Sequence, residues 1–281
     1  MTESNKPITR DLFLYVVIAY AFSWIFWLPQ VLSSNRLLEL PEFFVYIVGF
    51  VAPFGPLVAA FSVTYLKQGK EATKELLRRG ADYRFGKRWL IPLFLLFPLW
   101  AGSALLVGWL TEGVTIDLPW FSNPLSLVFN FSIYNFVYMF FFVGVSEEFG
   151  WRGYALDRLQ TRYSAVISSI MLGLIWGFWH LPLFFISGSP QQAAGLVPYL
   201  LQIVVFSIWL TWLYNNTGGS VLAAIIFHAM MDLTLLAIFP VTSIFAPSSL
   251  PVLYMYFSGL IILVAVIAIW GTKRMIREPK K

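Results

Sequence analysis

The sequence predicts an all-α fold, a polytopic bundle of about eight transmembrane helices that forms a single membrane domain over residues 1–281. Hydrophobic residues make up 59% of the chain and charged residues only 12%, against about 25% charged residues in soluble domains. Aromatic residues reach 19%. Apolar runs of about 20 residues, the length that crosses a bilayer, recur along the chain. Such a chain has too few polar side chains to cover a surface in water.

The first two predicted spans follow the polar N-terminal stretch MTESNKPITRD. The run Leu12–Leu32 has the full length of a span and lacks the short core of a signal peptide, so we expect it to be retained. The run Phe43–Leu66 contains APFGP, and membrane helices tolerate such residues where neighbours satisfy the freed backbone groups. The basic stretch KQGKEATKELLRRG that follows is expected to be a surface helix lying on anionic headgroups.

Six further apolar runs complete the predicted bundle. The fourth span continues without a loop signal into the charged stretch SEEFGWR, and the fifth contains Gly173 and Gly177, whose spacing favours close packing against another helix. We find no internal repeat and no linker that would divide the chain, and the chemically informative part covers about 125–240. The six runs are Trp89–Leu110, Leu125 to about Tyr154, Ala165–Ile186, Leu196–Tyr214, Ser220–Phe239 and Val252–Trp270.

Basic residues in the connections predict the orientation, because Lys and Arg concentrate on the cytoplasmic side of membrane proteins. Of the 19 Lys and Arg residues, only Arg36 falls in a connection on the opposite side from the others. Both termini are therefore expected to be cytoplasmic, in a multi-pass protein of a bacterial-type cytoplasmic membrane. This topology also accounts for the net charge of +5, so we expect the lipid bilayer, and no nucleic acid, as a partner.

Very few ionisable side chains fall within the predicted spans, and they include both histidines of the chain. A charged group at membrane depth costs about 2.5–3.5 kcal/mol, so such residues usually face a polar interior and have a function. The chain has no cysteine, which excludes a thiolate nucleophile and cysteine metal ligands. Carboxylates together with imidazoles are typical of a site that activates water. The residues are Glu147, Glu148, Arg152, His180, His228 and Asp232.

The spacing of these residues predicts two pairs along helices. Glu148 and Arg152 are four residues apart and can pair on one helix face, whereas Glu147 lies about 100° further round and must face another partner. Asp232 follows His228 by four residues and is expected to accept a hydrogen bond from the imidazole and fix its tautomer. A residue count at 1.5 Å per residue places His180 about 9 Å deeper in the membrane than Glu147 and His228.

Three short motifs resemble those of the CPBP intramembrane proteases, the family that includes type II CAAX prenyl endopeptidases and bacteriocin-immunity proteins. EEFGWR, which starts at Glu147, resembles the signature E-E-x-x-x-R. WGFWH, which ends at His180, is similar to F-x-x-x-H, with Trp176 in place of the usual Phe. HAMMD, from His228 to Asp232, resembles H-x-x-x-(Asn or Asp). The resemblance implies an intramembrane endopeptidase that cleaves a membrane-associated peptide, with prenylated CAAX-type proteins as one substrate class.

The resemblance also implies roles that fit the chemistry of the residues. Glu147 is expected to act as the general base and His180 to hold the same water, so that both are catalytic. His228 is expected to stabilise the oxyanion, with Asp232 orienting it. An ionised Asp cannot donate a hydrogen bond, which argues against a second oxyanion donor at 232 unless that acid is protonated. Glu148 and Arg152 are expected to support the site.

The need for a metal stays open at the level of the sequence. Glu147, His180 and His228 would make a workable zinc ligand set, but no H-E-x-x-H helix places two ligands beside a base. We favour water activation without a metal cofactor, with Zn²⁺ as the alternative. Two other classes of function also stay open: a proton-coupled transporter, since buried acids and histidines form proton relays, and a non-catalytic immunity or scaffold protein that retains the motifs.

Overall fold

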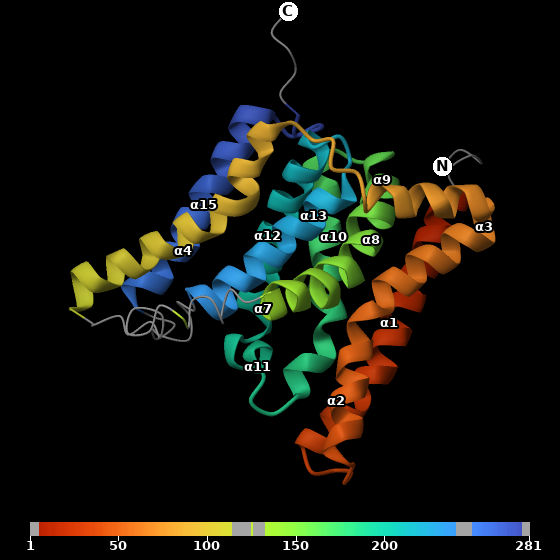
Figure 1. The fold of residues 1–281 in the computed structure, drawn as a ribbon, viewed down its shortest axis with the longest axis horizontal. Coiled ribbons are helices and arrows are strands. Elements are labelled where there is room, and N and C mark those ends of the chain that lie inside the picture. Colours follow the sequence, from red (N-terminus) through yellow and green to blue (C-terminus); the bar gives the residue numbers. More distant parts are fainter. Residues whose placement is uncertain (1–5, 114–124, 126–132, 240–248, 277–281) are drawn as a thin grey trace, which may run out of the picture.

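The computed structural model describes residues 6–113, 125, 133–239 and 249–276, and all regular structure in these ranges is helical. Figure 1 shows three groups of helices: α1, α2 and α3 on one side, α4 and α15 on the other, and the remaining helices between them. The α-helices are α1 (Lys6–Ser34), α2 (Glu42–Val51), α3 (Gly55–Arg79), α4 (Leu90–Glu112), α7 (Ile133–Tyr138), α8 (Ser146–Gly150), α9 (Asp157–Gln160), α10 (Ala165–Trp179), α11 (Pro190–Ala194), α12 (Leu196–Asn216), α13 (Val221–Asp232) and α15 (Leu250–Trp270).

Six helical segments of the described residues are long and apolar enough to cross a membrane, judged by length and composition. They confirm the first, second, third, fifth, sixth and eighth predicted spans. The segments are Arg10–Ser34, Glu42–Arg79, Lys87–Glu112, Ala165–Phe185, Leu196–Asn216 and Leu250–Trp270.

The other two predicted spans differ from this pattern. The seventh corresponds to a shorter apolar helix, Val221–Leu236. Much of the first half of the fourth lies outside the described residues, but its second half is continuous helix from Ile133 to Gln160, because α7, α8 and α9 are joined by π-helical segments at Met139–Val145 and Trp151–Leu156. π-helical turns are rare and occur frequently at functional sites.

The second predicted span continues into the basic stretch, which is helical as expected. The backbone of Gly69 has φ 80° and ψ −173°, which breaks the regular helix inside α3, and Figure 1 shows that the end of α3 turns away from the direction of its span. A left-handed φ of this kind costs Gly little and other residues more. The segment after the bend stays with the bundle, because Leu76 is buried and Arg79 pairs with Asp157 at 2.8 Å.

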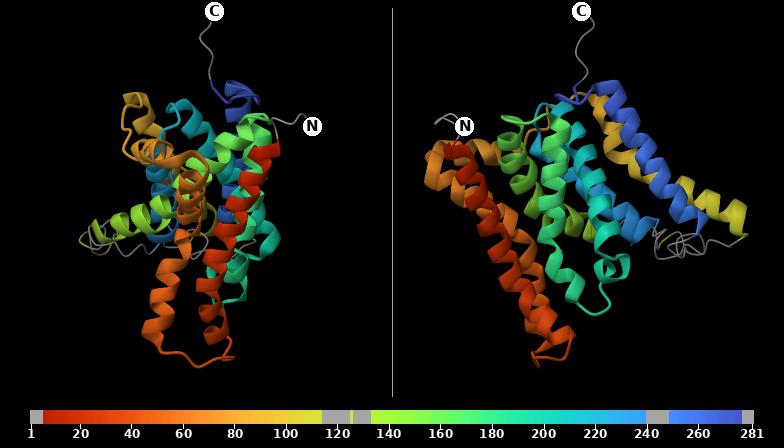
Figure 2. Two further views of the ribbon diagram at one scale, coloured as in Figure 1. Left: turned by 90° about the vertical axis from the view of Figure 1, so that its right-hand side faces the viewer. Right: turned by 180° about the vertical axis from the view of Figure 1, so that it is seen from behind.

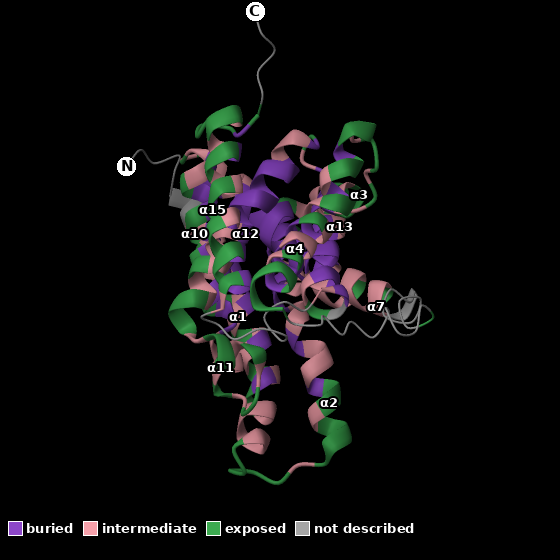
Figure 3. Ribbon diagram, turned by 90° about the vertical axis from the view of Figure 1, so that its left-hand side faces the viewer, coloured by how far each residue is buried: buried purple, intermediate pink, exposed green. Residues whose placement is uncertain are grey.

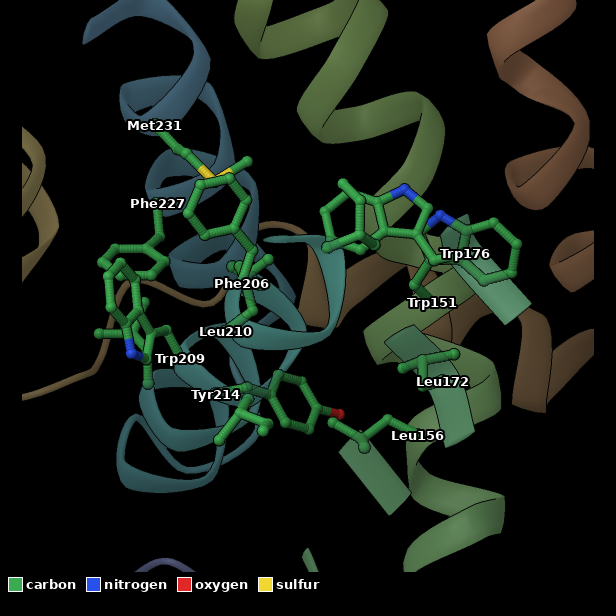
Figure 4. Close-up of a cluster of buried hydrophobic side chains, with 14 of the residues drawn as sticks. Trp151, Leu156, Leu172, Trp176, Phe206, Trp209, Leu210, Tyr214, Phe227 and Met231 are labelled. Carbon is green, nitrogen blue, oxygen red and sulfur yellow. The ribbon is translucent and has the colours of Figure 1, made fainter. Parts of the chain in front are cut away.

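The burial pattern suits a protein with lipid around it. Figure 3 shows that buried residues concentrate in the central helices, whereas the outer helices carry much exposed surface. Large apolar side chains such as Phe13 and Ile261 are 69% and 68% exposed. Figure 4 shows the central aromatic cluster, in which Trp209, Phe206 and Phe227 lie close together, with Trp151 and Trp176 nearby. The interior is therefore packed with large aromatic side chains around the polar residues.

Close approaches at glycine set the positions of the central helices. A Cβ atom at Gly144 would lie 2.7 Å from the carbonyl oxygen of Ile225, so only glycine lets α13 approach the helix that carries α8 so closely. A Cβ atom at Gly173 would lie 2.8 Å from the Cα atom of Val204, which confirms the predicted close-packing face between α10 and α12. Ser220 starts α13 by accepting a hydrogen bond from the amide of Ala223.

Candidate active site

Glu147 lies in α8 and is held by two tryptophans. Its Oε2 atom accepts hydrogen bonds from the indole Nε1 of Trp151 at 3.1 Å and of Trp176 at 2.6 Å. The side chain is 5% exposed. Its hydrogen-bond donors are therefore neutral indoles rather than a cation, and Oε1 is left for another partner.

Glu148 faces a different set of partners, as the helix spacing predicted. Its Oε1 atom lies 2.9 Å from Nη1 of Arg152 and 2.7 Å from Nδ1 of His228. Glu148 and Arg152 are both fully buried. The predicted pair of Glu148 and Arg152 is confirmed, and the same carboxylate also fixes the imidazole of a helix 80 residues further along the chain.

The expected hydrogen bond between His228 and Asp232 is not present. Nε2 of His228 lies 3.8 Å from Oδ2 of Asp232, which is too long for a hydrogen bond. The tautomer of His228 is instead set by Glu148 at Nδ1, so the prediction that Asp232 fixes it is wrong. The physical reason is the close approach of α13 at Gly144, which brings the imidazole onto a buried carboxylate of a neighbouring helix. Asp232 remains at the edge of the cluster, with its side chain 24% exposed.

His180 ends α10 and belongs to the same cluster. Its Nδ1 lies 3.0 Å from the carbonyl oxygen of Trp176, and a donating Nδ1–H leaves Nε2 as an acceptor. The ring centroids of His180 and His228 lie 6.2 and 5.1 Å from that of Trp176. Both imidazoles therefore contact one indole. They belong to one site, although residue counting predicted a difference in depth of about 9 Å between them. The count assumed straight helices parallel to one another, whereas the central helices are inclined (Figure 2).

Trp176 contacts more of the cluster than any residue singled out from the sequence. Besides its bonds to Glu147 and His180, its ring lies 4.9 Å from Cζ of Arg152, within cation–π range. The ring also lies edge-to-face against His228. Sequence reasoning noted Trp176 only as an unusual residue in the second motif. The sequence did contain a signal for this role. Trp176 stands four residues before His180, where the related motif usually has Phe, so an indole N–H donor replaces a hydrocarbon ring there.

The six predicted residues do not form a ready set of metal ligands. Across the described ranges, no three His, Cys, Asp or Glu side chains converge in a way that could hold a metal ion. Nδ1 of His228 is already bonded to Glu148, and Oε2 of Glu147 accepts from two indoles. Nε2 of both imidazoles and Oε1 of Glu147 remain outside these bonds, but the three side chains do not converge on one point as a tetrahedral zinc site requires.

Comparison with known proteins agrees with this arrangement. Residues 129–234, which include every residue of the cluster, match the family model described as type II CAAX prenyl endopeptidase Rce1-like. The chain is also 29% identical over 276 residues to CAAX prenyl protease 2 of Methanococcus maripaludis, a match that covers 94% of this chain and 95% of that protein. The chain is therefore similar to the Rce1-like type II CAAX prenyl endopeptidases, and the matched region holds the three motifs and the buried cluster formed from them.

Proposed function

We propose that this protein is an intramembrane endopeptidase that hydrolyses a peptide bond in a membrane-associated substrate, with prenylated CAAX-type peptides as the leading substrate class. The observation that carries the proposal is the fully buried Glu148, which joins His228 and Arg152 at 2.7 and 2.9 Å beside a second buried carboxylate. Six ionisable groups rarely gather at membrane depth without a function. The full-length match to a CAAX prenyl protease supports the same reaction.

In the proposed mechanism, Glu147 and His180 hold the attacking water. Both Oε1 of Glu147 and Nε2 of His180 are acceptors, so one water can donate a hydrogen to each. Glu147 takes a proton as the water oxygen bonds to the scissile carbonyl carbon. The same proton then passes to the amine nitrogen as the carbon–nitrogen bond breaks, which restores the carboxylate and releases two peptides.

His228 is proposed to stabilise the negative oxygen of the tetrahedral intermediate. Glu148 occupies Nδ1, so Nε2 is the atom left to face the substrate. An imidazolium has N–H donors at both nitrogens, so in that form Nδ1 donates to Glu148 while Nε2 donates to the oxyanion. Asp232 lies on the Nε2 side at 3.8 Å and orients the ring electrostatically. Arg152 balances the charge of Glu148 and thereby supports the site without contacting the substrate.

Trp176 is proposed as a positioning residue for Glu147. Its N–H donates to the carboxylate at 2.6 Å, and a donor to the charged form stabilises that form. Trp176→Phe keeps an aromatic ring against Arg152 and His228 and keeps the backbone carbonyl that holds His180, but it deletes the donor. We expect the acid limb of the pH–rate profile to move to higher pH by about one unit, since hydrogen bonds to charged groups are worth roughly 1.5–3 kcal/mol.

The other charged groups around Glu147 (Glu148, His228 and Asp232) are unchanged in Trp176→Phe, so the shift reports the lost donor. Trp212→Phe is the matched control, because Trp212 is another buried tryptophan and none of its contacts involves the cluster. A Trp176→Phe profile that coincides with that of the Trp212→Phe enzyme would show that the indole donor does not act on Glu147.

We further propose that the water is activated without a metal. The support is that, among the residues that the structure describes, no three His, Asp or Glu side chains converge in a way that could hold a metal ion. Elemental analysis of active protein is expected to find clearly less than one zinc per chain, and prolonged chelation should leave the rate unchanged. Zinc close to one per chain, lost in both His180→Ala and His228→Ala, with activity that disappears on removal and returns on re-addition, would overturn this mechanism.

The full topology is part of the proposal. Eight spans would require the helix containing Glu147 and the shorter Val221–Leu236 also to cross the bilayer, and the basic connections favour cytoplasmic termini. In that frame the substrate approaches the site by way of the bilayer of a cytoplasmic membrane.

The function is tested with purified protein in liposomes and a quenched fluorescent CAAX-type peptide, prenylated or unmodified, with the products mapped by mass spectrometry. Cleavage at one peptide bond that depends on Glu147 is the expected result. Uptake driven by an ion gradient without cleavage would indicate the proton-coupled transporter instead. Neither cleavage nor uptake would favour a non-catalytic immunity or scaffold protein.

A further inference from the structure

A groove on the outer side of the bundle lies away from the candidate active site. It is a cavity of about 970 Å³ at the neighbouring ends of α4, α12 and α15, and none of the six ionisable residues of the cluster lines it. Figures 1 and 2 show α4 and α15 side by side at this end of the molecule. The lining residues that carry the argument are Arg88, Trp89, Leu96, Leu99, Trp212 and Trp270.

The walls of this groove, which we call the α4/α12/α15 groove, are apolar and aromatic. The ring of Trp212 lies 5.3 Å from that of Trp89 and 5.2 Å from that of Trp270, edge-to-face in both pairs. The lining extends from Arg88, in the helical turn just before α4, along α4 to Leu99. At 1.5 Å per residue this is roughly 16 Å, about the depth of one leaflet in a hydrocarbon core of about 30 Å. The groove therefore has the length and chemistry of a site for an acyl chain.

The mouth of the groove is cationic. Arg88 is exposed, its guanidinium lies 5.5 Å from the centroid of the Trp89 ring, and it makes no hydrogen bond or ion pair with any residue that the structure describes. Lys87 precedes it, and Asn215, which also lines the groove, holds the chain beyond α15 in place by donating to the carbonyl oxygen of Arg274 at 2.8 Å. No Asp or Glu lines the groove.

A second cavity, of about 760 Å³, continues from this mouth. The acids that line it are already paired, so they do not neutralise the basic residues at the mouth. The two cavities share Asn215, Gly218 and Ile276. The second is lined by three acids, Glu75, Asp82 and Asp157. Each is paired with an arginine: Arg78 at 3.6 Å, Arg84 at 3.0 Å and Arg79 at 2.8 Å, respectively. The other basic residues that line this cavity, Lys273 and Arg274, make no ion pair within the described ranges. Unpaired cations thus surround the polar end of an apolar groove.

We propose that the α4/α12/α15 groove binds an anionic glycerophospholipid, with one acyl chain along α4 and the phosphate at Arg88. Apolar walls alone would accept any lipid, and the excess of cations selects an anionic headgroup, since basic pockets between membrane helices bind such headgroups. Tryptophans at this depth match the interfacial position that their amphipathic rings prefer. A free phosphate would leave the 16 Å of apolar wall without a role.

The test is a native mass spectrometry titration of the full chain in detergent with phosphatidylglycerol or with phosphatidylcholine of the same chain length. One phosphatidylglycerol is expected to bind more tightly than phosphatidylcholine. Arg88→Gln should weaken phosphatidylglycerol binding about fivefold, as a basic residue near a headgroup contributes about that factor, and should leave phosphatidylcholine unchanged. Leu96→Trp, which fills the groove without changing charge, should weaken both lipids.

Arg78→Gln is the matched control. Arg78 is also an exposed arginine, it pairs with Glu75 at 3.6 Å, and it does not line the groove. Equal effects of Arg88→Gln and Arg78→Gln would reduce the observation to general charge attraction and overturn the proposal. Displacement of phosphatidylglycerol by glycerol 3-phosphate alone, or undiminished binding in Leu96→Trp, would show that the acyl chain does not occupy the groove. The lipid titration does not measure peptidase activity, so its outcome is independent of the proposed function.

Discussion

Glu147→Gln is expected to lower the rate of peptide cleavage at least about a hundredfold, because a general base typically contributes 10²–10⁴-fold. The amide cannot take a proton from water. Its carbonyl oxygen can still accept the hydrogen bonds that Trp151 and Trp176 donate to the carboxylate. The variant should therefore stay folded and inserted, and steady-state cleavage of the fluorescent peptide with thermal unfolding in detergent measures both properties.

Glu147→Ala should be equally inactive but less stable, because it leaves two buried indole donors without an acceptor. Glu75→Gln is the matched control, since Glu75 is an exposed acid outside the cluster, and it should keep full activity and stability. Retention of more than about a hundredth of the wild-type rate in Glu147→Gln would remove Glu147 as the base. The loss would be assigned to misfolding only if stability fell with it.

Arg152→Ala is expected to cause the largest loss of stability of any substitution in the cluster, about 3–5 kcal/mol, because it leaves a buried carboxylate without its cation. Glu148 is fully buried, and its remaining partner would be His228. The substitution also removes the guanidinium stacked on Trp176. Reversible unfolding in mixed detergent micelles, or the thermal midpoint where unfolding is irreversible, measures the change.

Arg78→Ala is the comparison for this effect, because the same type of residue is removed from an exposed pair with Glu75. Exposed pairs contribute about 0–1 kcal/mol, so its stability should stay close to that of the wild type. The double variant Glu148→Gln, Arg152→Met should be more stable than Arg152→Ala, since it buries no unpaired charge. An Arg152→Ala protein of normal stability and no activity would place Arg152 in the reaction itself.

The features of the fold that could be predicted from the sequence are those that a single helix determines by its own residues. The apolar runs that became α1, α4, α12 and α15 are recognisable because a bilayer demands about 20 apolar residues in a row. The run Ser220–Phe239 is also helical over Val221–Ile238, but the change to a π-helical segment after Asp232 is not predictable from its apolar composition. Gly173 was identified as a packing position from its spacing to Gly177 alone.

The same limit applies to the candidate site. The pair of Glu148 and Arg152 was predictable because residues four apart always lie on one helix face, and the different partners of Glu147 and Glu148 followed from helix geometry. The partner of His228 was not predictable. Asp232 satisfies the same spacing rule, yet the imidazole bonds Glu148 on another helix.

The choice between these two carboxylates depends on how closely α13 approaches the helix that carries α8. Gly144 sets that distance by presenting no side chain to Ile225. The two indole bonds to Glu147 and the contact of both imidazoles with Trp176 likewise depend on the inclination of α10 and α13. Periodicity identifies the face of a helix on which a side chain lies. Which helix that face meets, and at what depth, is set by close packing between helices, which no run of residues along the chain encodes by itself.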